Sequence, residues 1–205
     1  MSIEADVKAR GKREETKASN RQAIIDAARE VFADLGYGAT TVRDIIRATE
    51  LASGTFYNYF KSKEEVFQAL QDETALRVRP RLRAERIRSR NFEGTFRTFF
   101  DFVKNDHTTF ATMRRNPENQ RVRIDTPEVV AGFDELRADL EIAIRNGVVP
   151  AIDADLLMAA MVGVAFEVAN HMLTRDDLSP GDAAKFATAW FLGGVQALPR
   201  KTGKR

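Results

Sequence analysis

The sequence predicts an all-α protein in which an N-terminal three-helix helix-turn-helix domain precedes a C-terminal helical domain. Apolar residues recur at helical spacing along most of the chain. No stretch alternates apolar and polar residues as a half-buried strand would. Near the N-terminus, helix-starting Ser and Thr residues and helix-ending glycines separate short helical stretches from one another.

The composition fits a compact protein without a thiol or histidine centre. The chain has 205 residues, 43% of them hydrophobic and 30% charged, which suffices for the core of one domain or two small ones. The absence of cysteine excludes disulfides, thiolate zinc sites and thiol nucleophiles. His107 and His171 lie far apart in the sequence, and no P-loop, dinucleotide-binding motif or nucleophile elbow occurs. We therefore expect neither an enzyme nor a cofactor.

The sequence shows no export signal and no predicted membrane span. The N-terminus is polar throughout, without the apolar core of a signal peptide. The longest strongly apolar run, residues 156–166, is shorter than the roughly 20 residues that cross a bilayer. We expect a cytoplasmic protein with no membrane partner.

Charge is unevenly distributed, with a net charge of only +2. Basic and acidic residues balance over residues 1–65, residues 77–123 are strongly basic and residues 124–205 are acidic. Bulk charge alone does not indicate a nucleic-acid-binding protein, so such an inference must depend on local geometry.

The first third of the chain should form closely spaced helices. Thr41 and Asp44 form a capping-box-like pair, as do Ser62 and Glu65. Gly36 should end the first helix. The expected helices are residues 20–35, 42–49 and 53–59, and a fourth from residue 62.

The remaining helices are longer. Pro80 should end or kink the fourth helix near Arg79, because proline lacks an N–H donor and restricts the residue before it. Asn146-Gly147 followed by Pro150 is a helix stop. The later helices are expected at residues 91–105, 107–115, 126–146, 153–174 and 180–197.

The third helix is the candidate DNA-reading element. The major groove accepts one α-helix, whose N-terminal residues present side chains to base edges. Phe56 and Phe60, four residues apart, should face the first helix and turn their neighbours outward. Lys63 stands at the start of the next helix, where free backbone amides also favour a phosphate. The candidate DNA-binding residues are Thr41, Arg43, Ser53, Gly54, Thr55, Tyr57, Asn58, Tyr59 and Lys63.

One string is more specific than a general helix-turn-helix pattern. It reads Thr41-Val42-Arg43-Asp44-Ile45 and then Gly54-Thr55-Phe56-Tyr57-Asn58-Tyr59-Phe60-Lys61-Ser62-Lys63-Glu64-Glu65. With these residues, the stretch 20–70 resembles the DNA-binding domain of the TetR (tetracycline-repressor-like) family. The resemblance implies a repressor that binds a palindromic operator in double-stranded DNA as a homodimer and responds to a small-molecule effector.

The resemblance also suggests individual roles. By its position in the motif, Arg43 resembles a residue that contacts a base or a phosphate. Thr55 and Asn58 resemble residues that contact base edges. Tyr57, Tyr59 and Lys63 resemble residues that contact phosphates. Two positions depart from the family pattern. Glu50 replaces the turn glycine, which would lengthen the second helix or hold Glu50 at positive φ. Ala52 replaces the capping serine, a role that Ser53 could take by a one-residue shift.

The last two predicted helices suit a dimer interface. Both combine small residues, which let helices approach closely, with large apolar ones, and each is apolar over more than one face. Two such helices from each subunit would form a four-helix bundle, as the family resemblance also implies. The alternative is burial within the monomer. The candidate interface residues are Leu157, Val164, Phe186, Trp190, Phe191 and Gly194.

A mixed Phe and Met cluster in the middle helices suits an adaptable apolar pocket. The alternative for each residue is ordinary core. The pocket candidates are Phe96, Phe99, Phe100, Phe110, Met113, Phe133, Met158, Met161, Phe166 and Asn170.

The arginines between Arg77 and Arg90 could ring the mouth of that pocket, together with Arg114, Arg115, Arg121 and Arg123. An apolar cavity with an arginine rim would suit an amphiphilic anion such as a fatty acyl-CoA, because Arg binds phosphate bidentately. The alternative is a solvated basic face.

These predictions give four segments: a disordered basic arm at 1–16, the helix-turn-helix domain at 17–64, the ligand-binding and dimerisation domain at 65–198 and a disordered tail at 199–205. The arm is either solvated or a minor-groove or phosphate contact. The competing interpretation of the whole chain is a ligand-independent DNA-binding or architectural helical protein, and an activator remains an alternative to a repressor.

Overall fold

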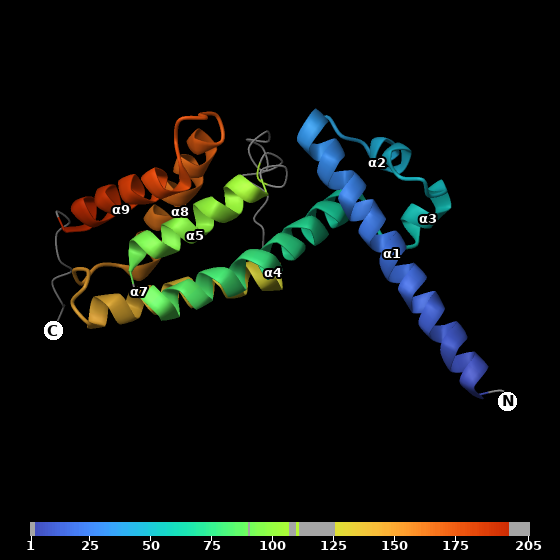
Figure 1. Ribbon diagram of the computed structural model, residues 1–205, viewed down its shortest axis with the longest axis horizontal. Helices are drawn as coiled ribbons and strands as arrows, with labels where there is room; N and C mark the ends of the chain where they lie inside the picture. Colours follow the sequence, from blue (N-terminus) through green and yellow to red (C-terminus); the bar gives the residue numbers. More distant parts are fainter. Residues whose placement is uncertain (1–2, 90, 107–109, 111–125, 197–205) are drawn as a thin grey trace. The chain divides into compact units, whose positions relative to one another are not determined.

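The computed structural model describes residues 3–89, 91–106, 110 and 126–196, and every element in them is an α-helix, which confirms the all-α prediction (Figure 1). The chain divides into two compact units within the fourth helix, between Glu73 and Thr74. This division lies later in that helix than the predicted boundary after residue 64.

Helix α1 spans Ile3–Leu35 and is much longer than predicted. The part expected to be a disordered arm, up to residue 16, is helical from Ile3. It is rich in Ala, Lys, Arg and Glu, which favour helix, and it extends a helix already nucleated by the packed part of α1. As predicted, α1 ends at Gly36, which has a φ of 81° that glycine adopts without steric cost.

The first unit packs α2 (Val42–Ala48), α3 (Ser53–Tyr57) and the start of α4 (Lys63–Ser89) on the C-terminal half of α1. The predicted short helices are thereby confirmed to within two residues. Residues from all four helices are fully or almost fully buried in one apolar core, which fixes α3 on its support. This core includes Ile24, Ala28, Phe32, Ile45, Phe56, Phe60, Val66, Phe67 and Leu70.

Helix α4 continues through Pro80 to Ser89, so the predicted stop near Arg79 is wrong. Arginines on either side of the proline pair with carboxylates of α7 (Pro127–Arg145). Arg79 Nε lies 2.9 Å from Glu135 Oε1 and Arg79 Nη1 lies 2.9 Å from Glu128 Oε2, while Arg86 pairs with Glu135 and Asp139. These tertiary contacts stabilise a helix that the local sequence alone would interrupt.

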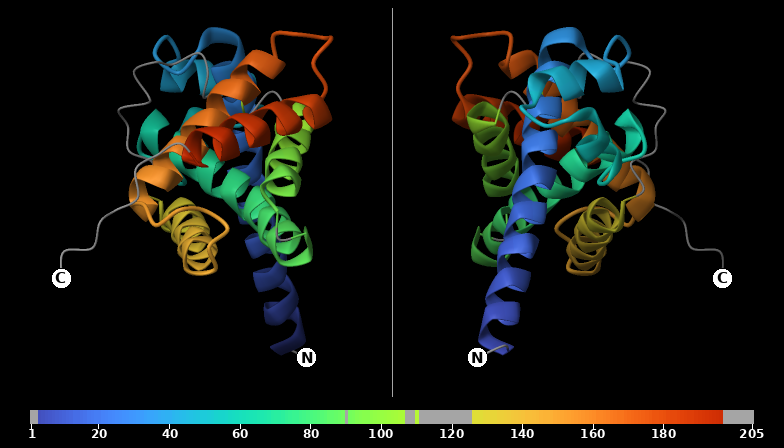
Figure 2. Two further views of the ribbon diagram at one scale, coloured as in Figure 1. Left: turned by 90° about the vertical axis from the view of Figure 1, so that its left-hand side faces the viewer. Right: turned by 90° about the vertical axis from the view of Figure 1, so that its right-hand side faces the viewer.

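The second unit contains α5 (Phe92–Asn105), α7, α8 (Ala154–Met172) and α9 (Pro180–Gln196), close to the predicted bounds. The helix predicted at 107–115 falls almost wholly outside the described residues. Helix α5 packs against α8 and α9, and α8 also packs against α7 (Figures 1 and 2). Phe96 and Phe100 of α5 and Phe191 of α9 form the centre of this core.

Helix α8 is longer than the apolar run recognised in the sequence. At 19 residues it is long and apolar enough to cross a membrane by length and composition. It packs against α5, α7 and α9 but keeps an exposed side, and one such helix passes the same test in proteins that do not cross a membrane. The length of α8 is therefore weak evidence for a membrane span.

Candidate DNA-binding surface and effector region

The N-terminus of α2 is closed by a reciprocal cap. Thr41 Oγ1 accepts from the Asp44 N–H, and the Asp44 carboxylate accepts from the Thr41 N–H at 2.9 Å, which confirms the predicted capping box. Hydrogen bonds from the Thr41 hydroxyl and backbone N–H lower the pKa of Asp44. The predicted contact Arg43 is exposed in the first turn of this capped helix.

The turn between α2 and α3 forms without the family's glycine. Helix α2 ends at Ala48, so it is not lengthened at Glu50. Thr49 Oγ1 donates to the Ile46 carbonyl at 2.8 Å and accepts from the Leu51 N–H at 3.3 Å, which organises the turn through a side chain. Ala52 occupies the N-cap of α3 without a side-chain hydrogen bond, so α3 begins at Ser53 and Ser53 does not take the cap.

Helix α3 divides into a buried face and an outward face, as its sequence predicts. Phe56 and Phe60 are 1% and 4% exposed. On the outward face a Cβ added at Gly54 would meet no atom within 4 Å, so the backbone is open to a close approach. Ser53, Gly54, Tyr57 and Asn58 are exposed, whereas Thr55 and Tyr59 are half-buried, Tyr59 against the core.

The Lys63 ammonium makes contacts within the first unit, and its role as a phosphate contact stays a prediction. Its Nζ donates to the backbone carbonyls of Tyr37 at 2.8 Å and Thr40 at 2.9 Å, and lies 4.5 Å from the centre of the Tyr37 ring. These acceptors belong to the segment that links α1 to α2. The ammonium therefore fixes that segment to the first turn of α4.

Sequence analysis did not recognise Tyr37 as part of this support. Its ring packs between Phe32 and Phe67, and its hydroxyl donates to Glu64 at 2.9 Å. Partial burial, with the carboxylate of Glu64 nearby, raises the pKa of Tyr37 above its ordinary range. The available signal was an aromatic residue between two glycines, directly after an apolar helix.

In the second unit, most predicted pocket residues form core. Phe96 and Phe100 stack with ring centres 6.0 Å apart, and Phe99 lies 5.5 Å from Phe166. Phe96, Phe100, Phe110 and Met161 are buried, Phe99, Met158 and Asn170 are half-buried, Phe133 and Phe166 are partly exposed, and Met113 lies outside the described residues. The ordinary-core alternative thus fits the buried members of this set.

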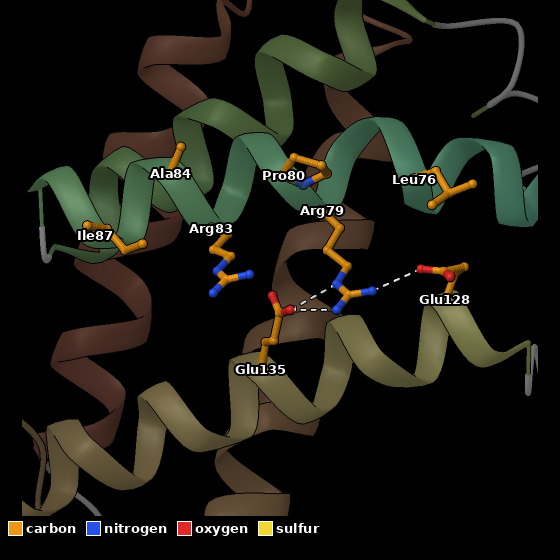
Figure 3. A pocket seen from close by; sticks show the side chains of 8 residues that line it. All are labelled: Leu76, Arg79, Pro80, Arg83, Ala84, Ile87, Glu128 and Glu135. Atoms are coloured by element: carbon orange, nitrogen blue, oxygen red, sulfur yellow. Dashed lines mark hydrogen bonds and ion pairs between the residues drawn. The ribbon is translucent and has the colours of Figure 1, made fainter.

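A hollow of about 350 Å³ lies instead between α4 and α7 (Figure 3). Two of the predicted arginines, Arg79 and Arg83, line it, and Figure 3 shows Arg79 bridging Glu128 and Glu135. Four further α4 residues supply an apolar wall, namely Leu76, Pro80, Ala84 and Ile87. The hollow therefore combines two guanidinium groups, the carboxylates of Glu128 and Glu135 and apolar surface, but not the predicted Phe and Met residues.

The other members of the arginine run have separate surroundings. Arg77 pairs with Asp106, and both Arg77 and Arg81 lie beside the Phe102 ring, at 5.7 and 5.6 Å from its centre. Arg88 pairs with Glu85 at 2.6 Å. Several predicted members fall outside the described residues, namely Arg90, Arg114, Arg115, Arg121 and Arg123.

The predicted dimer residues separate into an outer and an inner set. Phe186, Trp190 and Gly194 are exposed on α9, with Phe186 at 61% and Trp190 at 57%. Leu157 and Phe191 are 2% and 1% exposed, and Val164 is half-buried. Leu157 and Phe191 are therefore corrected to core residues, because they lie on the inward faces of their helices.

An exposed helix α3 on a buried helical support, followed by a separate helical unit, is a helix-turn-helix arrangement joined to a second helical unit. Residues 24–70 match the family described as "Bacterial regulatory proteins, tetR family". This part of the chain thus matches the TetR family, as the sequence motif suggested.

Similar proteins cover more of the chain. The transcriptional activator FasR of Mycolicibacterium smegmatis is 25% identical over 184 residues, which are 87% of this chain and 84% of FasR. The repressor KstR2 of the same organism is 45% identical over 51 residues, 25% of each chain. The structure of FadR from Bacillus subtilis in complex with stearoyl-CoA has a TM-score of 0.70 at 23% identity, covering 85% of this chain and 98% of FadR, and so shares the fold.

Proposed function

We propose that this protein is a ligand-responsive transcriptional repressor that binds a palindromic operator as a homodimer in the cytoplasm. The observation that carries the proposal is the outward face of α3, where Ser53, Gly54, Tyr57 and Asn58 are exposed while Phe56 and Phe60 anchor the helix. Such a face can enter a major groove and also reach its phosphates.

Tyr57 offers a direct test of this face. Its side chain is 60% exposed, so Tyr57→Ala should leave the fold intact and weaken binding to the DNA upstream of the protein's own gene, or to an operator selected from genomic fragments. Tyr57→Phe, which removes only the hydroxyl, is the matched control for a phosphate hydrogen bond. Wild-type protein that binds no genomic fragment tightly and salt-dependently would refute the proposal.

The homodimer is proposed from the exposed stripes of α8 and α9. On α8 the stripe contains Leu156, which is 72% exposed, together with exposed Gly163; on α9 it contains Phe186 and Trp190. Burial of these exposed apolar side chains against a second subunit would be favourable, and the small residues permit close helix approach. A four-helix bundle between two subunits would bury both stripes.

Trp190 is the single tryptophan of the chain and therefore a specific probe of that interface. Its fluorescence should shift to shorter wavelength as the protein concentration rises and the dimer forms. Trp190→Glu should yield a folded monomer with much weaker operator binding, whereas Lys185→Glu, also exposed on α9, is the control. A Trp190→Glu protein that remains dimeric in sedimentation would contradict this interface.

For the effector we propose an amphiphilic anion of the fatty acyl-CoA class. The hollow between α4 and α7 supplies Arg83 beside an apolar wall. The similar FadR structure contains stearoyl-CoA, which shows that the shared fold can accommodate such a molecule. Arginine suits the phosphates and apolar side chains suit the acyl chain.

Stearoyl-CoA should release wild-type protein from its operator. Arg83→Gln should weaken that response at unchanged DNA affinity, while Arg97→Gln, an exposed arginine of α5, should not. An equal response of all three proteins would overturn the arginine assignment. No response to any ligand would instead favour a ligand-independent DNA-binding protein.

The proposed response is a population shift carried by α4. This helix begins at Lys63, which fixes the support of the reading helix, and continues to Arg79 and Arg83 at the hollow. The effector must bind better to a conformer whose reading helices do not match successive major grooves, because only differential affinity moves the equilibrium. The similar proteins include an activator, FasR, and a repressor, KstR2. A reporter-gene assay therefore has to separate repression from activation.

A further inference from the structure

The N-terminal part of α1 extends well beyond the packed core of the first unit. Residues 11–19 are all exposed, and from residue 11 onward the first buried side chain of α1 is that of Ile24. An isolated helix without tertiary contacts is marginally stable in water. Core packing therefore does not account for this segment, and its surface needs a separate explanation.

A line of basic residues runs along this segment. Arg13, Lys17 and Arg21 are four residues apart and so lie on one side of α1. Ile24, Ala28 and Phe32, also four apart, are the residues by which α1 packs on the first unit. At roughly 100° per residue the two lines point within about 20° of each other. The basic line therefore continues the side of α1 that faces its neighbours in this unit.

The basic line begins beside the reading helix. The Arg21 guanidinium lies 5.3 Å from the centre of the Phe60 ring, and Phe60 stands three residues after Tyr57, the last residue of α3. From Arg21, Lys17 is about 6 Å and Arg13 about 12 Å further along the axis, at 1.5 Å per residue. The charges thus extend outward from the reading helix, along the projecting part of α1.

These charges are not neutralised within the part of the chain that the structure describes. No described carboxylate lies within ion-pair distance of Arg13, Lys17 or Arg21. Glu14 lies at the margin of the line, about 60° around the helix from Lys17. Lys12 lies on a different side, about 140° from Lys17.

We propose that Arg13 and Lys17 bind backbone phosphates of the operator duplex next to the bases contacted by α3. The inference rests on the proposed function, because it needs a DNA-bound reading helix. DNA is the fitting partner because the line is cationic, contiguous with the reading helix and directed away from the core. The contact would widen the footprint of each subunit without adding base specificity.

The test compares two duplexes that contain the selected operator. One carries about ten base pairs of flanking DNA on each side, and the other is trimmed to the two half-sites. Arg13→Gln and Lys17→Gln should each weaken binding to the long duplex about threefold to tenfold. Each should also reduce the salt-dependence slope by about 1.8 for the dimer, at about 0.9 per phosphate. The trimmed duplex should show no difference.

Two further variants separate local contact from net charge. Lys12→Gln removes the same charge from a different side of the helix and should leave binding to the long duplex unchanged. Glu14→Gln should tighten that binding. Far-UV circular dichroism should show equal helix content in all variants, so that a loss of contact is distinguished from a loss of helix.

The outcomes distinguish this inference from the proposed function. If wild-type protein binds neither duplex, the proposed function fails. If wild-type protein binds both duplexes and Lys17→Gln matches it, or if Lys12→Gln weakens binding as much as Lys17→Gln, the phosphate contact is refuted and the DNA-reading function stands.

Discussion

Lys63 contacts Tyr37 in two ways: its ammonium donates to the Tyr37 carbonyl at 2.8 Å and lies 4.5 Å from the centre of the same residue's ring. The ring in turn packs against Phe32 and Phe67 in the core. One lysine thereby links the start of α4 to the segment that precedes α2. Its position in the motif suggested a DNA contact, which stays a prediction, and its geometry adds a structural role.

Lys63→Met, which keeps the aliphatic stem, should destabilise the first unit by about 1.5–3 kcal/mol, as expected for hydrogen bonds that involve a charged group. Urea unfolding measures the change, and the exposed Lys61→Met is the control. A direct phosphate contact would instead lower the salt dependence of operator binding by about 1 per subunit. If Lys63→Met lowers the salt dependence of operator binding and leaves the free energy of unfolding unchanged, the structural role of Lys63 is contradicted.

Ala52→Ser should stabilise α3 by about 1 kcal/mol. The N-cap of α3 has extended backbone geometry but no side-chain acceptor, and a serine oxygen could accept from a free N–H of the first turn. For a chain of this size the melting temperature should rise by about 2–4 °C. Ala48→Ser, at the last residue of α2, offers no cap and should not produce the rise.

Pro80→Ala should stabilise the protein by up to about 3 kcal/mol, because proline is disfavoured by that amount in a helix interior. Thermal unfolding is the measurement. Pro127→Ala is the matched control, because Pro127 occupies the first turn of α7, where the missing N–H has no helical partner. Equal effects at both positions would mean that α4 does not continue through residue 80.

The Asp44 cap should make the first unit sensitive to acid. Hydrogen bonds from Thr41 lower the pKa of Asp44 below its ordinary value of 3.8. A carboxyl group whose folded pKa is depressed contributes stability that is present above its unfolded pKa. That contribution is lost as the pH falls through the folded value.

Asp44→Asn should therefore reduce stability at pH 7 and lose less on acidification to pH 3 than the wild type does. Urea unfolding at both pH values measures the difference. Thr41→Val removes the hydroxyl donor and should reduce the difference in acid-induced loss of stability between proteins with Asp44 and proteins with Asp44→Asn. If Asp44→Asn changes the acid-induced loss of stability as much in the Thr41→Val protein as in the wild type, the acid dependence of stability belongs to another group.

The local sequence was sufficient to place most helices of this chain. Helix periodicity is a short-range property, and caps such as Thr41 and stops such as Gly36 are read within one turn. The same local pattern placed Phe56 and Phe60 inside and Tyr57 outside, so the reading face of α3 followed from the sequence.

Other features depended on residues that are distant in the chain. The path of α4 through Pro80 involves ion pairs with Glu128 and Glu135, about fifty positions later, and no local rule anticipates them. Because Arg79 pairs with these carboxylates, Arg79 and Arg83 of α4 line a hollow that faces α7. Periodicity also could not separate Phe191 from Trp190, because α9 is apolar on more than one side and only the packing of α5 decides which side is inward.

The sequence by itself therefore determined the helical class, the reading helix and its motif, because these depend on spacing within a few turns. Tertiary structure alone decided the role of Lys63, the continuity of α4 and the inner and outer faces of α8 and α9. Each of these is set by the free energy of contacts between segments far apart in the chain, which outweighs local propensity where the two disagree.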